Sequence, residues 1–217
     1  MTPHFQRLGL SIWLAAAGSL AHAGVLLTES VTNSVDVVDT PFGGTLLGTA
    51  VTHIRNPSYN GVARTAVYES TLGLDFYYQF SNDATSVNGI ERFTAYDFRS
   101  LGIHTPVNIF QTSAAFDIFE AGTEAADHAD RSKLGVIGFN FVPNGTSYVN
   151  PGSNSYTMII RTDAHEFSGG HFGLLDGIGD NAVGFAPAAT VPEPSSSSLT
   201  LAGLALLMVG WRKLNRT

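Results

Sequence analysis

The feature that most limits what this 217-residue chain can fold into is the alternation of apolar and polar residues in short runs. The clearest run covers residues 74–80, in which every second position is apolar: Leu74, Phe76, Tyr78 and Phe80. The positions between them are mostly polar: Asp75, Tyr77 and Gln79. Successive side chains of a strand point to opposite faces of its sheet, so this run predicts a half-buried strand with a polar outer face.

Six further runs share this character and are separated by Gly, Pro, Asn and Ser residues. They cover residues 46–54, 62–69, 90–98, 134–142, 156–162 and 182–186. No long stretch has apolar residues at helical spacing; one short helix is expected at 124–133, with a polar loop as the alternative. At least seven strands separated by turns predict an all-β body over residues 24–186, as an antiparallel β-sandwich or jelly-roll-like fold.

The first 23 residues have the pattern of a secretory signal peptide. Arg7 gives a basic start, residues 8–20 are apolar, and Ala21 and Ala23 place small residues where signal cleavage requires them. The apolar stretch is shorter than the about 20 residues that span a bilayer comfortably. We therefore expect an N-terminal signal helix, cleavage after Ala23 and export of the remainder.

The C-terminal end reads as a spacer followed by a membrane segment. Residues 187–198 are rich in Pro, Ala and Ser, a composition that favours an extended linker. Residues 199–211 carry no charge, and the segment ends in an interfacial aromatic and a basic tail: Trp211, Arg212, Lys213 and Arg216. Such an order predicts a transmembrane helix within residues 199–217, with the basic tail inside and the body outside.

The order of these C-terminal parts resembles the PEP-CTERM sorting domain. Pro192, Glu193 and Pro194 come first, a short apolar helix follows, and the basic cluster stands at the end. The body also resembles the sandwich-like bodies that often precede this tail, in runs such as 74–82 and 167–187. The resemblance implies processing by an exosortase, a membrane protease-transferase of Gram-negative bacteria that make extracellular polysaccharide.

That resemblance also implies a route and a set of partners. The chain would be anchored transiently in the inner membrane through its C-terminal helix, with the body in the periplasm, and would end at the cell surface or outside the cell. The expected partners are an exosortase, the inner membrane and exopolysaccharide. The leading interpretation is a non-enzymatic surface or extracellular-matrix protein.

Charge and cysteine content exclude several other classes. All 18 acidic residues lie between Glu29 and Glu193, where only seven basic residues occur, so this part has a formal net charge of −11. An acidic surface repels phosphate backbones, and nucleic acid is therefore not expected as a partner. The chain has no cysteine, which excludes disulfides, thiol chemistry and cysteine metal sites.

Two segments contain potential metal ligands, but a metal site is expected in neither. His165, Glu166 and His171 form an HEFSGGH segment, but a zinc protease needs its histidines four apart on one helical face. Acidic residues gather at 124–130 as Glu124, Asp127, His128 and Asp130, and again at 176–180 with Asp176 and Asp180. Their spacing differs from that of an EF-hand, so polar turns are the expectation and calcium the alternative.

The sequence selects no catalytic or cofactor-binding residue. It has no Gly-x-Ser-x-Gly elbow, and its many acids do not single out a glycosidase pair. Tyr59, Tyr77 and Tyr148 could stack on sugars. A carbohydrate-binding module is therefore the first alternative function and a secreted hydrolase the second. A row of exposed aromatic residues on a sheet would favour the module, and a cleft with two converging carboxylates would favour the hydrolase.

Overall fold

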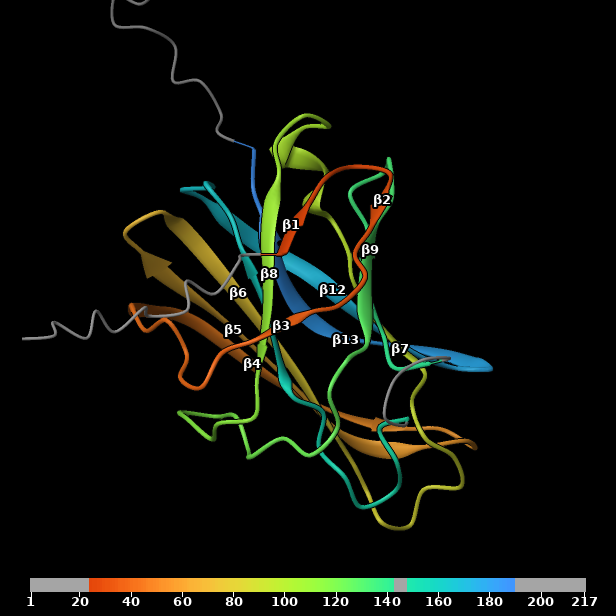
Figure 1. The fold of residues 1–217 in the computed structure, drawn as a ribbon. Helices are drawn as coiled ribbons and strands as arrows, with labels where there is room; N and C mark the ends of the chain where they lie inside the picture. Colours follow the sequence, from red (N-terminus) through yellow and green to blue (C-terminus); the bar gives the residue numbers. More distant parts are fainter. Residues whose placement is uncertain (1–23, 143–147, 190–217) are drawn as a thin grey trace, which may run out of the picture.

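The structure is a computed structural model that describes residues 24–142 and 148–189. The expected signal peptide, the Pro-Glu-Pro tripeptide and the expected transmembrane helix all lie outside the described residues. Within them the body is all-β and almost wholly antiparallel, with one short 3-10 helix, η1 (Phe98–Leu101), and no α-helix (Figure 1). None of the described residues forms a helix that could cross a membrane.

The strands form two sheets. Sheet A has seven strands, in the order β1 (Gly24–Leu26), β8 (Val107–Thr112), β11 (Thr157–Arg161), β6 (Gly73–Asn82), β5 (Asn60–Ser70) and β4 (Thr45–Arg55), with β3 (Asp36–Val37) parallel to β8. Sheet B has six, in the order β13 (Ile178–Pro187), β12 (Phe167–Asp176), β7 (Arg92–Ala95), β10 (Ile137–Asn140), β9 (His128–Arg131) and β2 (Ser30–Val31). The arrangement is therefore sandwich-like, and its strands are interleaved along the chain.

The main core lies between the two sheets. The apolar face of β6 supplies Phe76, Tyr78 and Phe80, and the sequence predicted this face correctly. Their partners in sheet B are Phe93 and Phe172, with ring centroids 6.4 Å apart for Phe80–Phe93 and 5.2 Å apart for Tyr78–Phe172. Burying a large side chain contributes about 1.5–3 kcal/mol, so this aromatic layer is a main source of stability in a body without disulfides.

The polar face of β6 corrects the prediction of a half-buried strand. Tyr77 is only 1% exposed, and Asp75 and Gln79 are fully buried. The loop after β8 covers this face, because Phe119 joins a second apolar cluster with Tyr77. Gln79 secures the loop through its amide, which donates to the Glu120 carbonyl at 2.6 Å and accepts from the Glu120 N–H at 2.9 Å. The alternation within β6 cannot show that a segment 41 residues later in the chain packs over this face.

The sequence located seven runs and missed or misread other elements. The strands β8 and β12 were not predicted, and the short helix expected at 124–133 is wrong, because β9 occupies this segment and pairs with β10 and β2. The run at 90–98 is shortened to β7, after which the chain turns into η1. β7, β8 and β9 are short, so pairing with distant strands decides their conformation, whereas β12 has ten residues, of which three are glycines.

The last strand ties the two sheets together. The Val183 N–H of β13 donates to the Thr52 hydroxyl of β4 at 3.2 Å, and the Val183 carbonyl accepts from the Thr65 hydroxyl of β5 at 3.2 Å. Gly177, with a φ of 59°, allows the tight hairpin in which Asp176 pairs with Ile178. The chain leaves the body at the far end of β13 from this hairpin (Figure 1).

Candidate ligand-binding face on sheet B

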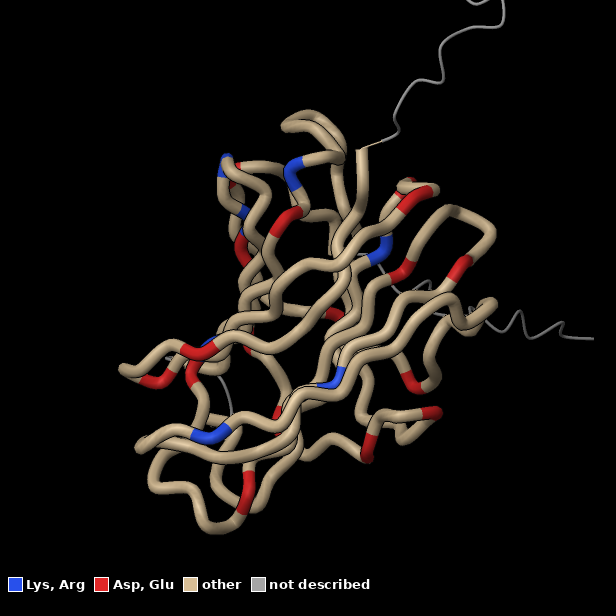
Figure 2. The backbone as a smooth tube through the Cα atoms, turned by 180° about the vertical axis from the view of Figure 1, so that it is seen from behind, with Lys and Arg blue, Asp and Glu red and all other residues tan. Residues whose placement is uncertain are grey.

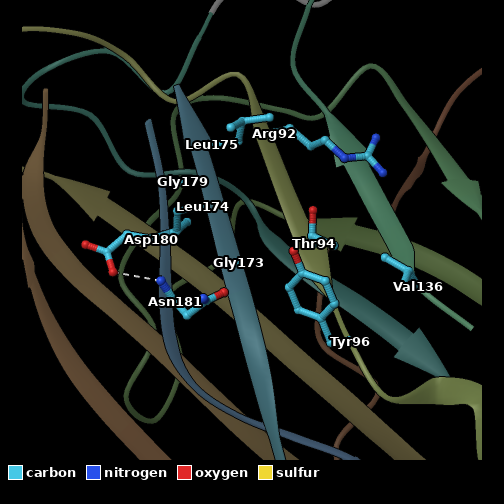
Figure 3. A pocket seen from close by; sticks show the side chains of 10 residues that line it. All are labelled: Arg92, Thr94, Tyr96, Val136, Gly173, Leu174, Leu175, Gly179, Asp180 and Asn181. Carbon is cyan, nitrogen blue, oxygen red and sulfur yellow. Dashed lines mark hydrogen bonds between the residues drawn. The ribbon is translucent and has the colours of Figure 1, made fainter. Parts of the chain in front are cut away.

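The outer face of sheet B carries an open groove of about 460 Å³. Strands β7, β12 and β13 supply most of its walls and floor, and Figure 3 shows the residues that line it. Small-molecule sites commonly have volumes of about 300–1,000 Å³ and combine apolar surface with a few polar groups. This groove has both, so it is the first candidate for a binding site in the described residues.

Strand β7 aims three side chains at the groove: Arg92, Thr94 and the following residue Tyr96. They point outward because Phe93 and Ala95, between them, are buried in the core. The sequence contains this signal, since a core face at Phe93 and Ala95 implies an opposite face at the neighbouring positions. These residues were nevertheless not predicted as a site, because nothing in the local sequence says whether that face is covered.

Arg92 is held in one orientation. Its guanidinium donates to the two Asp130 carboxylate oxygens at 2.5 and 2.9 Å and to the Asn140 side-chain oxygen at 2.6 Å. The Asn140 amide also donates to Asp130 at 2.8 Å. The guanidinium lies across Gly138, where any larger residue would overlap it. An acid and an amide from two strands thus fix a planar group on the sheet.

The ion pair also sets the charge state of Asp130. Burial raises the pKa of this carboxyl, but hydrogen bonds from Arg92 and Asn140 outweigh burial and hold its pKa below the ordinary value. The Asp130 side chain is 28% exposed and that of Arg92 25%. The pair is therefore ionised at neutral pH and carries no net charge into the groove.

Tyr96 lies across a second glycine. A Cβ atom at Gly173 would come within 2.7 Å of the Tyr96 ring and 3.0 Å of its hydroxyl. The phenol therefore rests on the β12 backbone, half-buried, with its outer surface facing the groove. Two glycines, on the strands that flank β7 on either side, thus create room for two planar side chains.

Uncommitted polar groups complete the lining. Thr94 is 8% exposed, lines the groove and has no hydrogen-bond partner for its hydroxyl among the described residues. Asn181 of β13 is exposed, and its side-chain amide is likewise without a partner in the described part of the chain. Polar groups that are poised at a groove without partners can bind a ligand that brings its own donors and acceptors.

The residues considered as metal ligands do not converge. His165 and Glu166 are exposed and precede β12, whereas His171 lies within this strand, 3.5 Å from the Asp97 carboxylate. No group of three or more His, Asp or Glu side chains in the described residues has a geometry that could hold a metal ion.

The two acidic segments have structural partners. Asp127 contacts the neighbouring His128 at 2.9 Å, and Asp130 belongs to the ion pair with Arg92. At the β12–β13 hairpin, Asp176 accepts from the Ser58 hydroxyl at 2.5 Å, and Asp180 accepts from Asn56 at 3.5 Å. These contacts fasten the hairpin to the loop before β5.

The expectation that Tyr59 and Tyr77 could stack on sugars is wrong. Tyr59 is fully buried and Tyr77 nearly so, because each packs inside an apolar cluster. The Tyr59 hydroxyl donates to the Leu174 carbonyl at 3.1 Å, and burial raises the pKa of Tyr59 to about 12. Tyr148 is 40% exposed but stands apart from the groove lining. The aromatic residue of the groove lining is Tyr96.

Comparison with known proteins identifies one segment. Residues 190–216 match the model of the PEP-CTERM protein-sorting motif, which contains the tripeptide Pro192–Glu193–Pro194. No curated protein and no solved structure matches the chain. The motif begins three residues after the end of β13 and implies exosortase-targeted export with transient membrane anchoring before cleavage.

Proposed function

We propose that this chain is an exosortase-processed surface or matrix protein of a Gram-negative bacterium, with a non-enzymatic body. The observation that carries the proposal is the sorting motif at residues 190–216, immediately behind the strand that closes the body. In this proposal Pro192, Glu193 and Pro194 are the processing site, the helix within 199–217 is the temporary anchor, and exosortase is the processing partner.

The position of β13 supports a body that is complete before the motif begins. Its last residue, Pro187, is buried, and the Ala188 N–H donates to the Glu166 carbonyl at 2.9 Å. Four residues, 188–191, then separate the strand from Pro192. Even fully extended they reach roughly 14 Å. The enzyme must therefore cleave close to a folded body, which an integral membrane enzyme can do if the body rests near the bilayer.

A role in binding rather than catalysis is the better proposal for the body. A hydrolase needs a carboxyl group that is free to exchange a proton or attack a substrate. Asp130 is engaged by Arg92 and Asn140, and Asp180, which lines the groove, accepts from Asn56 and from the Asn181 N–H at 2.8 Å. Support for the alternative of a carbohydrate-binding module comes from one half-buried aromatic residue of the groove lining, Tyr96, and not from a row of exposed aromatic residues.

Fractionation of cells that have an exosortase tests the proposal. Glu193→Ala should leave the precursor uncleaved in the inner membrane, because the helix is intact and the tripeptide is not. Leu206→Lys should instead release it as soluble periplasmic protein, since a lysine at a helix centre costs roughly 2.5–3.5 kcal/mol on an insertion scale.

Glu166→Ala is the matched control, because it removes an exposed acid from the body near the same exit point. This variant should be processed like the parent. Normal cleavage and surface delivery of Glu193→Ala would contradict the proposal and leave residues 199–217 as a plain membrane anchor.

A further inference from the structure

We propose that the groove on the outer face of sheet B binds an uncharged carbohydrate chain. The proposal names a ligand class for the surface role above, but it depends on no residue of the sorting tail. Failure of the processing experiment would therefore leave it standing, and its own failure would leave the sorting function intact.

The shape of the lining favours a sugar ring. The Tyr96 ring lies over Gly173 and the Arg92 guanidinium over Gly138, on the strands that flank β7. Pyranose rings have an apolar face of C–H groups, and flat aromatic and guanidinium surfaces pack well against such a face. Val136 and Leu175 add apolar surface beside these two groups.

The free polar groups favour hydroxyls as partners. Thr94 is more than nine-tenths buried and has no partner for its hydroxyl among the described residues, yet it faces the groove. Arg92 uses three of its five N–H groups on Asp130 and Asn140, which leaves two. Sugar hydroxyls both donate and accept, so they can satisfy Thr94, Arg92 and the Asn181 amide together.

The charges favour a neutral ligand over an anionic one. Arg92 is the one basic residue of the groove lining, and Asp130 neutralises it. Asp180 stands in the lining itself, and acidic positions outnumber basic ones across the body (Figure 2). An anionic ligand would have no unpaired cation to meet in this groove.

The position of the groove suits a chain that is long and approaches from outside. Asn181 stands six residues before the end of β13, about 20 Å along the strand at roughly 3.3 Å per residue. The groove is open rather than enclosed. A polymer could therefore cross it while the body is still tethered at Pro187.

Affinity electrophoresis of the full chain tests this proposal. The protein, in a detergent without sugar head groups, runs through native gels cast with hydroxyethyl cellulose, xylan, galactomannan or dextran as neutral probes. Carboxymethyl cellulose serves as the anionic counterpart of hydroxyethyl cellulose. At least one neutral polymer should retard the protein, and carboxymethyl cellulose should not.

Glycine variants locate the site without deleting its residues. Gly173→Ala should displace the Tyr96 ring and Gly138→Ala the Arg92 guanidinium, and each should weaken retardation at least tenfold in fitted affinity. Gly169→Ala is the control on β12, because a Cβ atom there meets no atom within 4 Å. Circular dichroism checks that all three variants fold.

Any of four outcomes would overturn the proposal. The first is no retardation by any neutral polymer. The second is retardation by carboxymethyl cellulose, whether or not a neutral polymer also retards the protein. The third is retardation that Tyr96→Ala, Gly173→Ala and Gly138→Ala all leave unchanged, since the ligand would then bind elsewhere. Sedimentation of the same samples tests whether a second copy of the chain occupies the groove. A dimer that dissociates in the Gly138→Ala variant would also contradict a carbohydrate site.

Discussion

The outer face of sheet A is covered where that of sheet B is open, although the strands of both sheets alternate core-facing and outward-facing side chains. On sheet A, the face that carries Tyr77 and Gln79 is sealed by the loop after β8. On sheet B, the face that carries Arg92, Thr94 and Tyr96 stays open and forms a groove. Polar side chains occur on both faces, so polarity alone does not decide exposure. What differs is whether a loop brings apolar rings that can pack there.

The largest expected effect comes from removing the cover of sheet A. Phe119→Ala should lower the free energy of unfolding by about 3–5 kcal/mol, because its buried ring packs on Phe116 and Tyr77 at centroid distances of 4.9 and 6.0 Å. Urea unfolding of residues 24–189, followed by circular dichroism, measures this change. A loss below 1 kcal/mol would mean that the loop does not seal the face.

A smaller loss is expected from the polar anchor of the same loop. Gln79→Ala leaves the Glu120 N–H, and the Glu120 and Ser155 carbonyls, without the partner they have on β6. Unpaired buried groups cost about 1–3 kcal/mol, and we expect a total loss of about 2–3 kcal/mol in the same assay. Combined with Phe119→Ala, the loss should be less than additive, because both changes release one loop. Strict additivity would argue against a shared role.

On the open face, the ion pair should give a pH-dependent effect. The pKa of Asp130 is lower in the folded state than in the unfolded state. The ion pair therefore contributes to the free energy of unfolding above the unfolded-state pKa of about 3.9, and this contribution is lost as the pH falls through the folded-state pKa. Asp130→Asn should cost about 1–2 kcal/mol at pH 7. The difference in the free energy of unfolding between this variant and the parent should stay constant down to about pH 5 and shrink below about pH 4.

Asp39→Asn provides the control for the loss of one negative charge at an exposed position. A deficit of Asp130→Asn that stays constant down to pH 2 would show that the carboxylate does not act through its charge.

The smallest effect should come from the aromatic residue of the groove. Tyr96→Ala should lower stability by about 1 kcal/mol or less, because its half-exposed ring rests on Gly173 rather than inside a cluster. Comparing the stability losses of the two single variants, Tyr96→Ala and Phe119→Ala, is the most direct comparison of the two faces. A loss near that of Phe119→Ala would make Tyr96 a structural residue and weaken its role in ligand binding.

The sequence by itself determined the all-β class, the core face of β6 and the sorting motif. Each of these depends on a local pattern: alternation between neighbours for Leu74 to Phe80, and a fixed order of segments for residues 190–216. The strands β4, β5 and β11 were also found close to their observed bounds, since their own residues alternate over enough positions to be recognised.

Only the tertiary structure decided which sheet face is covered and which is open. Tyr77 and Tyr96 illustrate this, because both alternate with core residues and yet one is sealed while the other lines a groove. Their exposure depends on loops and strands that are far away in sequence, such as Phe119 for the first and Gly173 for the second. Burial is a property of what packs against a residue, and packing partners are chosen by the fold rather than by neighbouring positions.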